Sequence, residues 1–249
     1  MQFGASIDIE GVEALRRQML GFERQIPFAT ALALTRVAQR VKQGELAVMK
    51  RRFDRPTKFT MNSLYVKRAK KGDSPPRATV HFRDFAPKGT PADTYLQPQV
   101  RGVRRNKKRF EKALIYAGAM KPDEWAIPGG GARRDVYGNV AKGQITQVLS
   151  ALRAFGEQGY QANATSSKSS RRKGNARRYF AGEVGGERGV WQRINSAFGE
   201  GVKPIFLFTR DEPSYRTRLP MTKIAENIAK ANYDREFSRA IEEAIATAR

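Results

Sequence analysis

Hydrophobic residues near the start of the chain recur with the spacing of one helix face. This spacing predicts a short amphipathic helix over about 10–22. Its apolar stripe consists of Val12, Leu15, Met19 and Phe22. Pro27 occupies a position typical of a first helical turn, so we expect a long second helix to begin there and to run to about Phe53. The apolar face of that helix comprises Ala31, Leu34, Ala38, Val41, Val48 and Met49.

The C-terminal end carries a third helical stripe. Pro220 follows an irregular, polar stretch and stands where a helix can start. The hydrophobic positions after it share one face: Ile224, Ile228, Ala231, Phe237, Ile241 and Ile245. The pattern predicts a long helix from Pro220 to the end of the chain.

Two regions alternate between apolar and polar residues, as strands do. Segments 63–69 and 78–86 flank a run of turn-forming residues and predict a β-hairpin or two sheet strands. Segments 189–194 and 203–211 predict an antiparallel pair. Aromatic side chains of this second pair, Trp191 with Phe206 or Phe208, are expected to face a core.

The centre of the chain is the least regular part. Segment 87–100 is expected to be irregular, whereas the apolar spacing predicts short helices over about 110–118 and 143–156. Segment 165–178 is polar and basic and contains no acidic or large apolar residue. It is expected to be a mobile loop or arm that orders on binding phosphate.

The order of the elements predicts an α+β fold. We expect an antiparallel β-sheet packed by long N-terminal and C-terminal helices, with an irregular central insertion. Residues 1–87 would supply the N-terminal helices and first strands of a core domain. Residues 88–182 would form the basic insertion, and residues 183–249 would complete the core with a strand pair and the last helix.

Positive charge is the strongest compositional feature. The 249 residues include 47 Lys and Arg against 24 Asp and Glu, a net charge of +23. Such self-repulsion destabilises a compact protein and indicates a large anionic partner, most commonly nucleic acid. The chain has no cysteine, which excludes disulfides, thiolate metal sites and cysteine nucleophiles. We expect a soluble protein made in the cytoplasm, because no signal peptide or membrane-spanning stretch is visible.

Catalytic motifs are weak or incomplete, so we expect no enzyme, no cofactor and no metal. His81 is the only histidine and falls in a predicted strand, more typical of a surface residue than of a catalytic base. The glycine-rich run 128–134 lacks the Lys-Ser/Thr ending of a phosphate-binding loop. The acidic pairs are neighbours in sequence and therefore do not face a shared site: Asp123 with Glu124, Asp211 with Glu212, and Glu242 with Glu243.

Two basic clusters are the candidate contact sites. The first comprises Arg104, Arg105, Lys107, Lys108 and Arg109. The second comprises Arg171, Arg172, Lys173, Arg177 and Arg178. Such side chains bind phosphate groups without base preference, and no base-reading motif is recognisable. They also suit docking onto acidic protein surfaces, and the sequence leaves both roles open.

The two ends of the chain resemble one known family. Segment 11–44, with its core Ala33-Leu34-Thr35-Arg36-Val37-Ala38, resembles the start of the tailed-phage minor tail protein Z family, the tail completion proteins. Segment 218–249 is similar to the end of the same family, and the strand pair over 189–211 is similar to paired strands of neck proteins. The long centre, 88–182, departs from the family pattern.

The resemblance implies a structural virion protein at the neck, where the tail joins the head. It implies a homo-oligomer, a hexameric ring around the DNA channel, with the head–tail connector, tail terminator and tail tube as neighbours. Genomic DNA backbone would be a further partner, and no membrane would be involved. The alternatives are another neck or tail component, such as an adaptor or tail terminator, a minor capsid component, and a non-specific nucleic-acid-binding protein.

Overall fold

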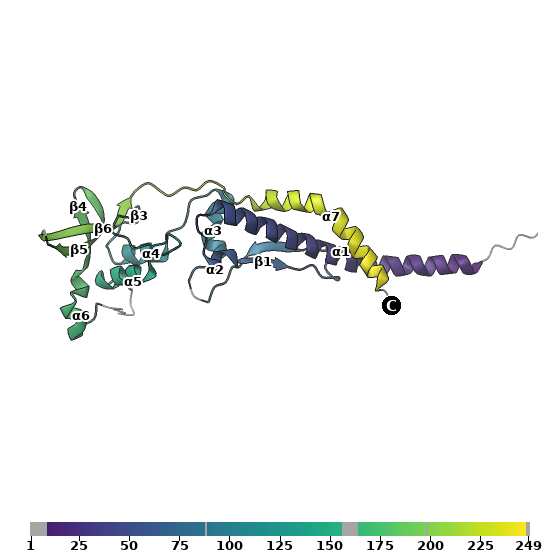
Figure 1. Ribbon diagram of the computed structural model, residues 1–249, viewed down its shortest axis with the longest axis horizontal. Coiled ribbons are helices and arrows are strands. Elements are labelled where there is room, and N and C mark those ends of the chain that lie inside the picture. The colour runs from purple at the N-terminus through teal and green to yellow at the C-terminus, as the bar shows by residue number, and fades with distance from the viewer. Residues whose placement is uncertain (1–8, 88, 156–163, 198, 248–249) are drawn as a thin grey trace, which may run out of the picture. The chain divides into compact units, whose positions relative to one another are not determined.

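The computed structural model describes residues 9–87, 89–155, 164–197 and 199–247 (Figure 1). The fold is α+β, as predicted: two long terminal helices pack together, the sheets are antiparallel, and the central region is mixed. Contacts divide the chain into two compact units. The helical unit consists of Met1–Arg101 with Thr217–Arg249, and the sheet unit consists of Gly102–Arg216.

Two long helices dominate the helical unit. Helix α1 spans Ile9–Arg52 and α7 spans Met221–Ala246, and the two lie side by side (Figure 1). Their seam is built from alanines that are at most 1% exposed: Ala29, Ala33, Ala240 and Ala244. Because these side chains are small, the two backbones approach closely, and Leu32, Phe237 and Ile241 pack around the seam.

The predicted break before Pro27 is wrong, because α1 continues through that residue. An interior proline cannot donate to the carbonyl four residues earlier and typically destabilises a helix by about 3 kcal/mol. Two features favour continuity here. The preceding segment is rich in strong helix formers such as Leu, Arg, Gln and Met, and tight packing on α7 begins at Ala29, two residues after the proline. In the sequence, Pro27 is compatible both with the first turn of a new helix and with the interior of a continuous one.

A small hairpin completes the helical unit. Strands β1 (Leu64–Lys67) and β2 (Thr79–Phe82) pair antiparallel, which confirms the predicted hairpin. They follow the single-turn helix α2 (Lys58–Met61). A core cluster joins the hairpin to α1 and to the start of α7; its buried members are Met49, Leu64, Phe82, Ala92, Leu96 and Leu219.

Segment 87–100, expected to be irregular, contains helix α3 (Ala92–Arg101). Pro98 inside the helix obscures its periodicity in the sequence. Local polar contacts support the helix instead. Asp93 stands in its first turn, where a negative charge is favourable, and its Oδ1 accepts a 2.8 Å hydrogen bond from Nε2 of Gln97 one turn later.

The sheet unit is built on one antiparallel four-stranded sheet with the order β3-β6-β5-β4. Its strands are β3 (Trp125–Pro128), β4 (Tyr179–Val184), β5 (Glu187–Ser196) and β6 (Gly199–Thr209). The pairing of β5 with β6 confirms the predicted strand pair, and Trp191 and Phe206 are both buried. Strands β3 and β4 were not predicted.

Two predicted helices of the centre are present and cover this sheet. Helices α4 (Arg109–Tyr116) and α5 (Lys142–Ala151) contribute Leu114, Val148 and Leu149 to the core of the unit. The sheet contributes Val190, Ile205 and Phe206 to the same cluster. This core forms the platform on which the candidate site is displayed.

The two units differ from the three segments expected from the sequence. Strands β5 and β6 fall in the sheet unit with the central residues, and the chain returns to the helical unit only at Thr217. The reason is strand pairing: β6 pairs with β3, and β5 pairs with β4. The boundary expected at 182–183 lies inside β4.

Candidate polyanion-binding surface

Segment 165–178, expected to be a mobile arm, is largely helical. It forms α6 (Lys168–Arg172) and the 3-10 helix η2 (Asn175–Arg177). The side chain of Ser167 caps α6 by accepting a 3.2 Å hydrogen bond from the N–H of Ser170. Gly174 turns the chain between the two short helices with a φ of 61°, which favours glycine. Local hydrogen bonds therefore shape a segment that has no large apolar residue.

All five cations of the second predicted cluster are exposed on this folded segment. They are Arg171, Arg172, Lys173, Arg177 and Arg178. Within the described ranges, none of the five side chains forms an ion pair with a carboxylate. The surrounding sequence explains this, because 164–182 contains no Asp or Glu. The folded segment thus presents positive charge that these ranges do not neutralise.

Arg193 adds a sixth cation that sequence reasoning missed. Strand pairing brings Arg193 of β5 beside the start of β4, and its N–H donates to the carbonyl of Arg178 at 2.9 Å. Its guanidinium donates to the carbonyl of Arg177 at 2.5 Å and lies 4.4 Å from the ring centre of Phe180. Only the strand register reveals this neighbour. We call Arg193 together with the five cations of 171–178 the basic surface.

The first predicted cluster is used differently, and Arg105 shows this most clearly. Its side chain is 10% exposed and donates two hydrogen bonds to Glu111, at 2.6 and 2.7 Å. Its guanidinium also lies 4.7 Å from the ring centre of Trp125. A cation held this way stabilises the sheet unit and is not available to a phosphate.

Burial by itself would raise the pKa of Glu111. The hydrogen bonds from Arg105 and from the N–H groups of Lys108 and Ala126 outweigh burial and hold the pKa below its usual range. The carboxylate is therefore charged and fully engaged, with 0% of the side chain exposed. It joins the start of α4 to strand β3.

The remaining members of the first cluster are divided between internal and surface roles. Lys107 lies 3.8 Å from the Trp125 ring centre and donates to the carbonyl of Glu124. Arg104 pairs with Glu212 at 2.6 Å on the surface. Lys108 and Arg109 are exposed at the start of α4. The structure thus separates two clusters that look alike in sequence.

Three carboxylates from the acidic pairs of the sheet unit each hold an arginine: Asp123, Glu124 and Glu212. Glu124 accepts from Arg188 at 2.8 Å and its side chain is 5% exposed. Asp123 pairs with Arg210 at 3.2 Å on the surface. Burial would raise the pKa of Glu124, but the hydrogen bond from Arg188 outweighs it and lowers the pKa. Each of these carboxylates therefore has a structural partner of its own.

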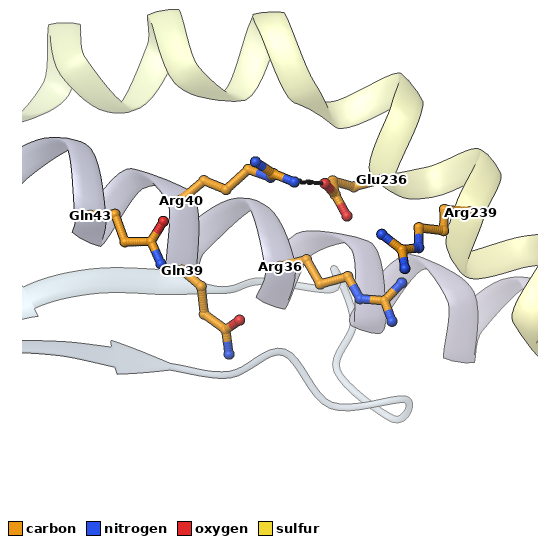
Figure 2. A pocket seen from close by; sticks show the side chains of 6 residues that line it. All are labelled: Arg36, Gln39, Arg40, Gln43, Glu236 and Arg239. Carbon is orange, nitrogen blue, oxygen red and sulfur yellow. Dashed lines mark hydrogen bonds and ion pairs between the residues drawn. The ribbon is translucent and has the colours of Figure 1, made fainter.

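The third acidic pair lies on α7, where Glu243 pairs with Arg36 and Arg239, two residues that line a polar pocket of about 320 Å³ between α1 and α7. Figure 2 shows its lining: Arg36, Gln39, Arg40, Gln43, Glu236 and Arg239. Arg36 reaches Glu243 at 2.6 Å, and Arg40 reaches Glu236 at 2.6 Å. These ion pairs link the two helices, so the pocket belongs to the α1–α7 packing.

The lone histidine and the glycine-rich run both have structural roles. His81 is exposed on β2 and packs edge to face on Tyr65, with ring centres 5.3 Å apart. The glycine-rich run lies against β6: a Cβ at Gly129 or Gly131 would come within 2.9 Å of Pro204. These glycines therefore permit a close backbone approach. Among the described residues there is no group of three His, Cys, Asp or Glu suited to hold a metal ion.

In the described part of the chain, no helix has the length and apolar character needed to cross a bilayer. Comparisons with protein-family models, with curated proteins and with solved structures found no match to this chain.

Proposed function

We propose that this protein is a structural component of a phage virion, a tail completion or head–tail joining protein whose basic surface faces the DNA backbone. The observation that carries the proposal is the basic surface itself. It gathers five exposed cations of a folded segment and a sixth on the adjoining strand β5, and within the described residues none of them is neutralised by an ion pair. Uncompensated cations on a rigid platform suit a partner with closely spaced negative charges.

Phosphate groups of duplex DNA match this chemistry. Arginine and lysine side chains bind them through charge and hydrogen bonds and release counterions, without reading base sequence. A ring would multiply the effect, because six copies of a chain with net charge +23 bring about 140 excess charges to one annulus. The proposal therefore predicts strong, salt-sensitive and sequence-independent binding.

The two segments that resemble the tail completion family support the same proposal. Segment 11–44 lies in α1, and most of segment 218–249 lies in α7, far apart in sequence. These helices pack against each other along the alanine seam in one unit. The resemblance thus falls on two helices that belong to one structural unit.

Two other functions use the same surface. An adaptor, a tail terminator or a minor capsid component would also place a basic face next to DNA or acidic neighbours. A non-specific nucleic-acid-binding protein would need the basic surface alone and no ring. The +23 charge favours all of these equally, so particle association distinguishes the neck proteins from the free DNA-binding protein.

The experiment is to purify phage particles from cells infected with a phage whose genome encodes this chain. Mass spectrometry of the particles and cryo-electron microscopy of the neck would then locate the chain. We expect a cyclic ring of this protein between head and tail. A chain that is absent from particles and monomeric in solution would contradict the proposal.

A further inference from the structure

The sheet unit has two edge strands, β3 and β4, and one of them is closed. Strand pairing with β6 leaves the backbone groups of Ala126 facing away from the sheet. The N–H of Ala126 is occupied by Oε1 of the buried Glu111, at 3.1 Å. Pro128, the next outward residue, has no N–H to offer. Strand β3 therefore has no outward N–H free to bond a further strand.

Edge β4 is different, and the register shows which of its groups are free. A two-residue turn, Gly185–Gly186, joins β4 to β5, so the flanking pair Val184 with Glu187 is hydrogen bonded. Hydrogen-bonded pairs then alternate along the ladder. The hydrogen bond from the N–H of Arg193 to the carbonyl of Arg178 fits this pattern, because these two residues form a hydrogen-bonded pair six residues before Val184 and six after Glu187.

Ala181 and Glu183 consequently direct their N–H and C=O groups away from β5. No hydrogen bond from any described residue reaches these four groups. Unpaired strand groups of this kind are a template for another extended chain. Within the described residues, β4 is therefore an edge at which the sheet can grow.

A hollow of about 390 Å³ lies along this edge. It is lined by Ala119, Leu152, Tyr179, Ala181 and Arg188, among other residues. Successive side chains of an added strand point to opposite faces, so every second side chain can enter the hollow. Its small and partly apolar lining suits a residue of the size of valine or threonine.

The charge around the edge indicates the partner. Arg177 and Arg178 directly precede β4 and form no ion pair among the described residues, whereas Arg188 in the hollow is held by Glu124. An acidic segment would be attracted by the exposed positive charges of Arg177 and Arg178.

We propose that the free edge of β4 binds an extended, acidic segment of a partner protein as a fifth strand. Backbone hydrogen bonds to Ala181 and Glu183 would supply affinity. The hollow would select the side chain that enters it, and the arginines at the start of β4 would select its charge. This inference adds a protein-docking edge to the proposed function, and it stands whether or not the chain sits in a phage neck.

The probe is a fluorescein-labelled synthetic peptide of nine residues in which valine and threonine alternate with aspartate. Fluorescence anisotropy with the full-length protein measures its affinity. Proline is tolerated on an edge strand where its nitrogen faces outward. We therefore expect Ala181→Pro to weaken binding about tenfold, because it removes one outward donor. Circular dichroism and tryptophan fluorescence spectra of Ala181→Pro that match those of the wild type serve as the folding control.

A second experiment changes the peptide and leaves the protein unchanged. The same peptide, N-methylated at alternate amides, loses the donors that would bond the carbonyls of β4. We expect this peptide to bind at least about tenfold more weakly than the parent, although its charge is identical. Hydrogen exchange should also show new protection at the amides of Ala181 and Glu183 when the parent peptide binds.

Three results would overturn the inference. The first is no saturable binding of the parent peptide, and the second is equal binding of the N-methylated peptide, which would mean charge attraction alone. The third is a dimer in sedimentation velocity that Ala181→Pro dissociates, which would make a second copy the occupant. Duplex DNA binding serves as the counter-test for Ala181→Pro. It should be unchanged, and its loss would place DNA at this edge.

Discussion

Arg105 donates two hydrogen bonds to Glu111 inside the sheet unit, at 2.6 and 2.7 Å, from a position in one of the most basic runs of the chain. The pair has two consequences. It withdraws a cation from the surface, and it holds the carboxylate that closes the β3 edge through Ala126. A basic run in sequence is therefore not by itself a binding surface.

The first prediction concerns this ion pair. Arg105→Ala leaves a fully buried carboxylate without its main partner, and such a loss typically costs about 3–5 kcal/mol. Urea unfolding followed by tryptophan fluorescence reports this unit selectively, because Trp125 and Trp191, the two tryptophans of the chain, both lie in it. We expect a clear decrease in its free energy of unfolding.

Arg104→Ala is the matched control, since Arg104 is 73% exposed and its surface pair with Glu212 is worth about 0–1 kcal/mol. Equal effects of the two substitutions would contradict the internal role of Arg105. The depressed pKa of Glu111 adds a pH dependence. Its contribution is present above the unfolded-state pKa and is lost as the pH falls through the folded-state pKa.

The second prediction concerns Glu45 of α1, which is 1% exposed. Burial raises the pKa of this carboxyl group from 4.5 to about 7. The folded state therefore binds the proton more tightly than the unfolded state. Its stabilising effect is complete below about pH 4.5 and is lost as the pH rises to about 7, a difference of about 3 kcal/mol.

Glu45→Gln removes this titration while preserving the shape of the side chain. We expect the variant to be more stable than the wild type at pH 8, by up to about 3 kcal/mol, and nearly equal to it at pH 4. Urea unfolding followed by circular dichroism at 222 nm measures the difference, because α1 and α7 dominate the helical signal. A difference between the two proteins that does not change with pH would refute the prediction.

The third prediction concerns Gly189 in β5. A Cβ at this position would collide with the main-chain carbonyl oxygen of Phe206 and would lie 3.3 Å from the Cα of Leu207. Backbone atoms cannot move aside without breaking the β5–β6 pairing. We expect Gly189→Ala to destabilise the sheet unit by about 2–4 kcal/mol.

Gly201→Ala tests the same change in the neighbouring strand β6. There the nearest atoms to a new Cβ belong to the side chain of Ile194, at 3.6 Å, which is ordinary contact. We expect an effect below about 1 kcal/mol in the same fluorescence assay. If Gly189→Ala proved as mild as this control, the register of β5 with β6 would be wrong.

The fourth prediction concerns the alanine seam of α1 and α7. Ala33 is 0% exposed, and the close approach of the helices leaves no room for a larger side chain. Ala33→Leu should destabilise the helical unit by about 1–3 kcal/mol through overpacking. Ala231→Leu, at an exposed position of α7, should change stability by less than about 0.5 kcal/mol. Thermal unfolding followed by circular dichroism compares the two variants.

Elements with a large apolar face were predictable from the sequence. The stripe from Ile224 to Ile245 predicted α7, and the alternation around Trp191 and Phe206 predicted the β5–β6 pair. Elements stabilised by polar contacts were not. Helix α6 depends on the Ser167 cap and contains no large apolar residue, and strand β3 is only four residues long.

The candidate site was predictable only in part, for the same physical reason. Composition and clustering singled out the basic run from Arg171 to Arg178, and the structure places all of its cations on the surface. Arg193 joins them through strand register, which a linear run cannot reveal. The burial of Arg105 depends on Glu111 and Trp125, and no local pattern indicates that these residues meet.

The central claim is that the basic surface, and not the first cluster, contacts the phosphate backbone. The direct measurement is the salt dependence of duplex DNA affinity for the wild type and two variants of equal charge change. One variant replaces Arg171, Arg172 and Lys173 with alanine, and the other replaces Arg104, Lys108 and Arg109. We predict that the first variant lowers the slope of log affinity against log salt by about 2–3, and that the second leaves it nearly unchanged. Equal slopes for the two variants, or an unchanged slope in the first, would contradict the claim.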